Sequence, residues 1–325
     1  MIIGIVCYPT YGGSGVVATE LGMALANKGH KVHFITYNQP VRLNFMNKNI
    51  HFHEVFVEEY PLFLYQPYEL ALSSKMVEVV IQYKIEILHV HYAIPHAYAA
   101  YMAKQILKEK GINIKVVTTL HGTDITLVGS HPDYKTAVEF SINSSDAVTA
   151  VSKSLKNDTL RLFDIKKEIE VIYNFIDFEK YQDDQFDKND RSNLANENER
   201  IIIHTSNFRP VKRVHDVIEI FNKIQLKIPS KLLMIGDGPL RVAVEKLVKS
   251  YQIQDKVFFL GKTDDVNKLL CHADLFLLPS ETESFGLAAL EAMAAKTPVI
   301  SSNAGGLSEV NINGITGYLS KVGDV

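Results

Sequence analysis

The sequence predicts an α/β protein made of two halves, each with a parallel sheet covered by helices. Short apolar runs typical of buried strands alternate with helical segments along nearly the whole chain. One strongly polar stretch, residues 178–199, interrupts this alternation near the middle, as a linker between domains would. A chain of 325 residues is also long for a single core. We therefore expect two domains, residues 1–170 and residues 171–325.

Composition excludes several classes of protein. The net charge of -3, with 22% charged residues, gives no electrostatic basis for binding nucleic acid or a membrane surface. Cys7 and Cys271 lie in separate apolar segments and indicate buried thiols in a reducing compartment. The start of the chain lacks a signal-peptide pattern, and no apolar run approaches the ~18 residues of a membrane span. We expect a cytoplasmic protein with neither nucleic acid nor membrane as a partner, and homo-oligomer formation stays open.

The first half begins with a βαβ unit: a strand at 1–8, a glycine-rich turn at 12–15, a helix at 16–28 and a strand at 31–36. The glycines let backbone amides approach a ligand, and the helix start favours an anion. The turn does not match Gly-x-Gly-x-x-Gly, and no acidic residue ends the second strand, which argues against a dinucleotide-dependent dehydrogenase.

Residues 37–75 are expected to be irregular. There follow helices at 76–84, 97–109, 134–143 and 153–162, and strands at 86–91, 114–120, 146–151 and 170–177, with Ser152 as the cap of the last helix.

Polar residues gather where two of these strands end. Residues 91–96 follow one strand, and residues 118–124 close another. In open α/β sheets, ligands bind outside the carboxyl ends of the strands, so both clusters are candidates for a site. His121 is either a buried core histidine or a site residue, and its position at a strand end beside residues 122–124 favours the site.

The second half repeats the α/β pattern. Strands are expected at 201–206, 231–235, 256–260, 275–278 and 298–301, with helices at 212–227, 240–250, 264–271 and 286–296. The strand at 275–278 leads through a polar turn into the last of these helices. Such a strand, turn and helix start place backbone amides where an anion can sit. Glu283 lies before the helix and Glu291 about one and a half turns inside it, so one ligand could meet both. The alternative is an ordinary amphipathic helix with two solvated glutamates.

This Glu-x7-Glu pattern around Ser284-Phe285-Gly286 resembles the retaining family 4 glycosyltransferases, which use sugar nucleotides and have the GT-B fold. The resemblance implies two Rossmann-like domains facing across a cleft. It implies that Glu283 meets the donor sugar, that Glu291 meets the ribose hydroxyls and that the turn amides meet the diphosphate. Family members usually continue with one or two more helices, so we expect this chain to be truncated at its C-terminal end.

The resemblance also assigns the cations. An Arg and a Lys near the start of the second half bind the donor diphosphate in this family and stabilise the leaving group, which carries negative charge. Here Arg209 precedes Lys212 by three residues and not by the commoner five. We assign both these roles, with Arg213 as a substitute. We expect no essential metal, because the Asp-x-Asp spacing of metal-dependent transferases does not occur near a strand end.

Five motifs, at residues 7–9, 12–15, 91–96, 120–124 and 206–213, resemble one member of the family in particular. That resemblance implies UDP-GlcNAc as the donor and L-malate as the acceptor. The expected catalytic residues are His121, Arg209, Lys212 and Glu283. The expected donor-binding residues are Gly13, Gly15, Asn207, Gly236, Ser284, Phe285, Gly286, Leu287 and Glu291. The expected acceptor-binding residues, which could hold two carboxylates, are Ser14, Tyr92, Thr119, Thr123 and Lys153.

The sequence leaves three alternative functions open. A family 4 transferase could use another small acceptor or a lipid-linked one, although the sequence lacks an obvious basic and apolar patch for lipid. A GT-B sugar-nucleotide epimerase would need no glycosyl acceptor. A catalytically inactive protein would bind UDP-sugar without releasing UDP.

Overall fold

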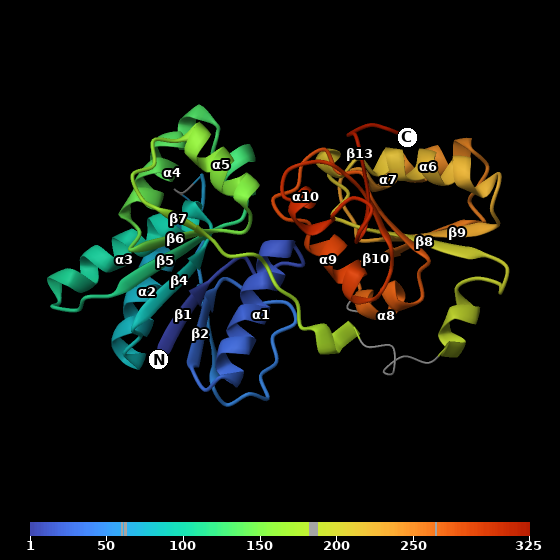
Figure 1. Ribbon diagram of the computed structural model, residues 1–325. Coiled ribbons are helices and arrows are strands. Elements are labelled where there is room, and N and C mark those ends of the chain that lie inside the picture. The colour runs from blue at the N-terminus through green and yellow to red at the C-terminus, as the bar shows by residue number, and fades with distance from the viewer. Residues whose placement is uncertain (60, 62–63, 182–187, 264) are drawn as a thin grey trace. The chain divides into compact units, whose positions relative to one another are not determined.

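The computed structural model describes residues 1–59, 61, 64–181, 188–263 and 265–325. The chain divides into two compact units, Met1–Asn174 and Phe175–Val325. Each unit is an α/β unit in which helices flank a parallel sheet (Figure 1). Among the described residues, no helix is long and apolar enough to cross a membrane.

The first unit contains, within the described residues, a seven-stranded sheet in the order β3-β2-β1-β4-β5-β6-β7. All its neighbouring strands are parallel. The order reverses between β1 and β4. The strands are β1 Ile2–Val6, β2 Lys31–Thr36, β3 Ile50–Glu54, β4 Ile87–His91, β5 Lys115–Leu120, β6 Ala147–Ala150 and β7 Ile169–Val171. The helices are α1 Gly13–Asn27, α2 Tyr68–Tyr83, α3 Tyr98–Glu109, α4 Pro132–Ser144 and α5 Lys153–Leu162.

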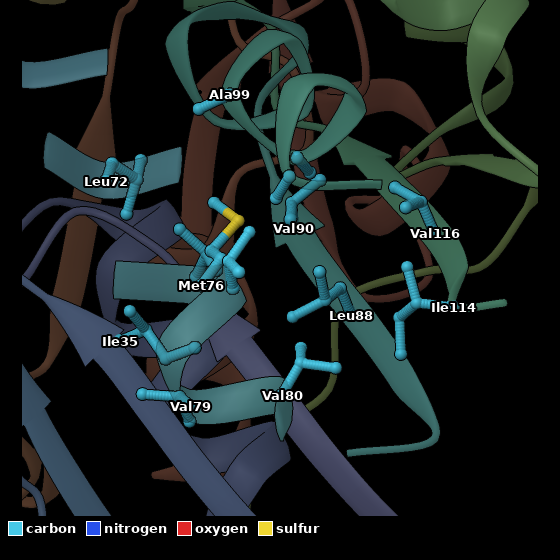
Figure 2. Close-up of a cluster of buried hydrophobic side chains, with 14 of the residues drawn as sticks. Ile35, Leu72, Met76, Val79, Val80, Leu88, Val90, Ala99, Ile114 and Val116 are labelled. Atoms are coloured by element: carbon cyan, nitrogen blue, oxygen red, sulfur yellow. The ribbon is translucent and has the colours of Figure 1, made fainter. Parts of the chain in front are cut away.

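Helices cover both faces of the first sheet because alternate strand residues point to opposite sides. Ile5 and Phe34 pack with α1 on one face. Ile35, Leu88 and Val90 pack with α2 and α3 on the other (Figure 2). A Cβ on Gly22 of α1 would lie 2.3 Å from Cζ of Phe34, so this glycine lets the helix lie directly on the sheet. Burying each large apolar side chain contributes roughly 1.5–3 kcal/mol.

The second unit contains, within its described part, a six-stranded parallel sheet in the order β10-β9-β8-β11-β12-β13. Here the order reverses between β8 and β11. The strands are β8 Arg200–Thr205, β9 Ser230–Ile235, β10 Val257–Gly261, β11 Leu275–Leu278, β12 Val299–Ser302 and β13 Gly317–Ser320. The helices are α6 Val214–Gln225, α7 Arg241–Ser250, α8 Val266–Cys271, α9 Leu287–Ala294 and α10 Leu307–Val310. Helices α6 and α7 cover one face, whereas α8 and α9 cover the other.

Several local expectations differ from the structure. The boundary expected after residue 170 would cut β7, whose Val171 is aligned with Ala150 of β6, so the strand stays with the first unit. Strand β3 lies inside the stretch expected to be irregular, of which residues 60, 62 and 63 lie outside the described residues. Helix α2 begins at Tyr68, well before residue 76. The short elements α10 and β13 were not expected.

The expected linker at 178–199 is only in part a surface loop. Tyr181 and Ala195 are buried in the second unit, where they pack against the face covered by α8 and α9. Residues 182–187 of the linker lie outside the described residues, as does residue 264 at the start of an expected helix. The described ends of this stretch therefore form part of the core of the second unit.

Candidate active site

Each described sheet has one place where its strand order reverses, and the loops there carry many, though not all, of the expected site residues. At such a point the two neighbouring crossovers leave toward opposite faces, and the loops after the strands open a crevice. In the first unit, these are the loops after β1 and β4. In the second unit, they are the loops after β8 and β11, which carry residues 206–213 and 279–286.

The turn between β11 and α9 depends on glycine at one position. Gly286 has φ +97°, a conformation that favours glycine, and a Cβ there would lie 2.5 Å from Cδ2 of Leu307. Phe285 is buried beneath the turn. The helix starts at Leu287, so the amides of Leu287 and Ala288 lack intrahelical acceptors, whereas that of Ala289 donates to the carbonyl of Gly286 at 2.9 Å. An anion could meet these two amides, and the donor-binding role of residues 284–287 stays a prediction.

A salt bridge joins the two loops of the second unit. Lys212 Nζ lies 2.5 Å from Glu283 Oε1, and both side chains are mostly buried. Ser280 donates a second hydrogen bond to the same carboxylate oxygen, at 2.8 Å. The structure therefore brings together two of the four expected catalytic residues, Lys212 and Glu283, and fixes Glu283 from two sides.

A buried histidine, His204, interacts electrostatically with both charges of this pair. His204 Nδ1 donates to the backbone carbonyl of Leu277 at 2.8 Å, and Nε2 then accepts from Ser206 Oγ at 2.8 Å. Burial lowers the pKa of His204 to about 4, and the nearby charge of Lys212 acts in the same direction. The imidazole is therefore neutral near pH 7, and it ties the end of β8 to β11.

The other cations near β8 differ in their surroundings. Arg213 has φ +47° and donates from Nε to Asp216 Oδ2 at 2.6 Å. Arg209 is exposed and forms no ion pair with a residue that the structure describes. Arg213 is thus paired with Asp216. Lys212 is held by Glu283 at the candidate site, and Arg209 lies at the surface on the same loop.

Two further donor-binding candidates lie where backbones pack closely. A Cβ on Gly236, which has φ +110°, would lie 1.8 Å from the carbonyl oxygen of Ser206. Asn207 follows Ser206 and is exposed. Gly236 therefore lets the turn after β9 pack against the loop that carries Asn207 and Arg209. Its amide donates to the carbonyl of Gly261 at 2.7 Å.

Glu291 is buried in α9, with only 7% of the residue exposed. Its Oε1 accepts a hydrogen bond from the hydroxyl of Tyr181 at 3.0 Å. The alternative of two solvated glutamates is therefore wrong for this helix, since Glu291 is buried and Glu283 is held in an ion pair. Tyr181 was missed at the sequence level, because nothing local connects it to a residue 110 positions away.

In the first unit, one hydrogen bond crosses the reversal between β1 and β4. The hydroxyl of Tyr92 donates to Ser14 Oγ at 2.7 Å. Helix α1 starts at Gly13, earlier than the expected Val16, so Ser14 lies in its first turn. A Cβ on Gly15 would lie 2.5 Å from the carbonyl oxygens of Tyr8 and Thr10, so only glycine allows this approach. Gly13 and Ser14 thus present the helix start, while Gly15 serves mainly to pack it.

Four histidines lie close together in the first unit: His91, His96 and His121 are buried, and His89 is half-buried. His91 Nδ1 and His121 Nε2 share a hydrogen bond of 2.8 Å, and His89 stacks on His91 with ring centroids 4.7 Å apart. His96 Nδ1 donates to the carbonyl of His91. Burial lowers the pKa of His121 to about 3 and those of His89 and His96 to about 4, and it lowers the pKa of His91 further below its usual value. His121 is therefore neutral near pH 7 and can orient a ligand but cannot supply a positive charge.

Asp124 holds the loops around these histidines. Its Oδ2 accepts from the amide of Ala93 at 2.8 Å, and its Oδ1 accepts from the amides of Gly122 and His121 at 2.9 and 3.2 Å. Burial raises the pKa of Asp124 to about 6, although these amides oppose the shift. Tyr92, immediately before Ala93, has φ +92°, a strained value for a residue with a side chain. Asp124 thus helps to hold Tyr92 in a conformation that directs its hydroxyl to Ser14.

The remaining acceptor-binding candidates, Thr119, Thr123 and Lys153, differ in their surroundings. The hydroxyl of Thr119 shares hydrogen bonds of 2.8 Å with His89 Nε2 and with Thr149 Oγ1, so protein partners already occupy it. Thr123 begins the helical turn Thr123–Leu127. Lys153 is the exposed first residue of α5, which Ser152 caps by accepting from the amide of Leu155 at 3.0 Å, as expected.

Comparisons with known proteins identify the class. The family model described as Glycosyltransferase Family 4 matches residues 11–180, and that described as Glycosyl transferases group 1 matches residues 185–325. The chain belongs to the family 4 glycosyltransferases, and the resemblance seen in the sequence is confirmed. It is 53% identical over 322 residues to N-acetyl-alpha-D-glucosaminyl L-malate synthase of Bacillus anthracis, covering 99% of this chain and 84% of that protein.

Solved structures agree on the fold. Sucrose-phosphate synthase from Thermosynechococcus elongatus matches with a TM-score of 0.79 at 22% identity, covering 100% of this chain and 86% of that one. Anabaena HepE in complex with UDP-glucose matches with a TM-score of 0.78 at 20% identity, covering 99% and 86%. The α/β fold of two Rossmann-like domains, of the GT-B kind, is thereby confirmed.

The carboxylate of Asp124 suggests a first test. Asparagine has one acceptor oxygen, so Asp124→Asn sets an NH2 donor against at least one backbone N–H. We expect a loss of about 1–3 kcal/mol in the free energy of unfolding, measured by urea denaturation. Asp133→Asn, at a side chain with 80% exposure, is the matched control. Equal stability of the two variants would contradict the role given to Asp124.

The buried histidines suggest a second test. The unfolded chain takes up protons on His89, His91, His96 and His121 near pH 6.5, whereas the folded chain does so only near pH 4 or below. Their contribution to stability is therefore full above pH 6.5 and is lost as the pH falls. Asp124 acts in the opposite direction, because its raised pKa makes the folded chain take up one proton at a higher pH than the unfolded chain does. Each uncompensated proton steepens the fall by about 1.4 kcal/mol per pH unit.

Urea unfolding of the chain at several pH values between 7 and 5 measures this slope. We expect His91→Gln to make the slope shallower by about one proton. A stability that does not fall on acidification would show that these histidines are not held neutral.

Proposed function

We propose that the chain transfers N-acetylglucosamine from UDP-GlcNAc to the hydroxyl of L-malate, with retention at the anomeric carbon and release of UDP, the first step of bacillithiol biosynthesis. The observation that carries the proposal is the 53% identity, over 99% of this chain, to a synthase named for that product. The site supports it, because each unit places polar residues around the point where its strand order reverses.

The second unit offers the groups that a nucleotide-sugar donor needs. The start of α9 and Lys212 would meet the diphosphate, together with the exposed Arg209. Glu283, positioned beside Lys212, would accept from hydroxyls of the sugar. Glu291, deeper in α9, would accept from the ribose hydroxyls. Positive charge beside the diphosphate stabilises the negative charge that develops as UDP leaves.

The first unit offers groups suited to a small dianion. The start of α1 presents backbone amides beside Ser14, and Tyr92 reaches the same serine from the loop after β4. Thr123 and Lys153 come from neighbouring loops of the same sheet edge. The hydroxyl of Thr119 is bound to His89 and Thr149, so we assign it a supporting role in this arrangement.

The proposed chemistry needs no nucleophile from the protein. The bond from the anomeric carbon to the phosphate oxygen breaks, and a bond to the malate oxygen forms on the same face. The leaving phosphate oxygen takes the hydroxyl proton. Glu283 is already paired with Lys212 and Ser280, which favours a positioning role over nucleophilic attack. His121, with a pKa near 3, would contact the sugar as a neutral group.

We also propose that no metal ion is essential, because Lys212 and Arg209 would supply the positive charge that a metal provides in other transferases. Among the described residues, neither Cys7 nor Cys271 forms a disulfide, which supports the proposal of a reducing, cytoplasmic location.

UDP release from UDP-GlcNAc tests the reaction, with and without L-malate and with and without EDTA. We expect release that depends on malate and survives EDTA. Succinate, which lacks the hydroxyl, is the matched control and should support no release. Release without any acceptor would favour an epimerase, whereas no release with malate would leave a binding protein or another acceptor. Loss of activity in EDTA would overturn the proposed metal independence.

The role of Lys212 is tested by Lys212→Met, which keeps the length of the side chain and removes its charge. We expect kcat for UDP release to fall by about 10²–10³-fold, since the leaving diphosphate loses one stabilising group. Lys227→Met, at an exposed lysine beyond α6, is the matched control and should keep the activity of the unchanged chain. A Lys212→Met variant with full kcat would remove this residue from the mechanism.

A further inference from the structure

Tyr181 lies in the described part of the expected linker, yet its side chain reaches the candidate nucleotide site. It ends the helical turn Phe178–Tyr181, and only 5% of the residue is exposed. Its ring packs in the apolar cluster beneath α8 and α9. Its hydroxyl donates to Glu291 Oε1 at 3.0 Å. A residue outside every expected motif therefore contacts a residue expected to bind the ribose.

The backbone of Tyr181 is itself anchored. The side-chain amide of Asn267 donates to the carbonyl of Lys180 at 2.8 Å, and Cys271 Sγ lies 3.8 Å from the carbonyl oxygen of Tyr181. Both Asn267 and Cys271 belong to α8. The phenol thus projects from a turn fixed to α8 toward a carboxylate on α9. Its position is determined by the packing of the second unit.

This arrangement suits orientation more than simple packing. A buried carboxylate needs hydrogen-bond donors, and a single fixed donor restricts the rotation of its terminal torsion. A phenol has one O–H donor, so it engages one carboxylate oxygen in a set direction. The plane of the Glu291 carboxylate is thereby constrained before any ligand arrives. Such preorganisation increases affinity by reducing the entropy lost on binding.

We propose that Tyr181 is a positioning residue for nucleotide recognition, which orients the Glu291 carboxylate so that it accepts from the ribose hydroxyls of the donor. The inference rests on the proposed function, because it takes the ligand of Glu291 to be the ribose of a uridine diphosphate sugar. Tyr181 does not touch the reacting atoms. Its effect reaches the ligand only through Glu291.

The test compares two ligands in the unchanged chain, in one variant and in a control variant. The ligands are UDP and its 2′,3′-dideoxy analogue, which lacks both hydroxyls, and their Kd values are measured by calorimetry on the whole chain. The unchanged chain should bind UDP more tightly than the analogue. In Tyr181→Phe, which removes only the hydroxyl group, UDP should bind about 5–30-fold more weakly while the analogue binds as before. Tyr318→Phe, at a residue with 65% exposure, is the matched control.

The outcomes separate this inference from the proposed function. If the unchanged chain does not distinguish the two ligands, the ribose assignment of Glu291 fails, and the role of Tyr181 fails with it. If the unchanged chain distinguishes them and Tyr181→Phe does so equally well, the inference alone is overturned. Equal weakening of both ligands in Tyr181→Phe would show a structural role only.

Kinetics provide a second readout that a purely structural effect would not give. The ribose contact exists both in the bound substrate and in the transition state, so its loss should raise KM for UDP-GlcNAc and leave kcat nearly unchanged. Thermal unfolding of Tyr181→Phe checks that the second unit stays folded at the assay temperature. A fall in kcat with an unchanged KM would contradict the positioning role.

Discussion

The reversal of strand order within its parallel sheet is the constraint on which the candidate site residues of each unit depend. Parallel strands need crossover connections, and the connections on either side of a reversal cover opposite faces of the sheet. The loops after β1 and β4, and those after β8 and β11, therefore diverge and leave room for a ligand. Side-chain contacts join the two loops in each unit: Tyr92 bonds to Ser14 and packs against Tyr8 in the first unit, and Lys212 pairs with Glu283 in the second.

The two units hold their polar groups by different physical means. The first unit buries neutral histidines and Asp124, whose hydrogen bonds to backbone amides fix a strained loop at Tyr92. Such groups can orient a ligand, whether uncharged or anionic, through hydrogen bonds without adding positive charge. The second unit instead pairs opposite charges, Lys212 and Glu283, whose side chains are mostly buried. Under the proposed function, a bound diphosphate would offer Lys212 a charged partner that competes with Glu283.

Much of this could be predicted from the sequence, because strand interiors such as residues 275–278 are continuous apolar runs and the polar turns after them are short. Strand β3 was missed because two of its residues, His51 and His53, are polar by composition. In the structure both rings stack on His33, and burial lowers the pKa of His33 to about 3, so that it packs as a neutral ring. The contact of Asp124 with Ala93 and that of Tyr181 with Glu291 could not be predicted, since each partner is distant in the sequence and no periodicity encodes such pairs.

The central claim is that the nucleotide binds at the reversal between β8 and β11 and the acceptor at the reversal between β1 and β4. A crystal structure of the chain with UDP and L-malate tests this directly. We expect the diphosphate at the start of α9 beside Lys212, the ribose at Glu291, and the malate carboxylates near Ser14 and Tyr92. UDP bound in the first unit, or malate bound away from α1, would contradict the account.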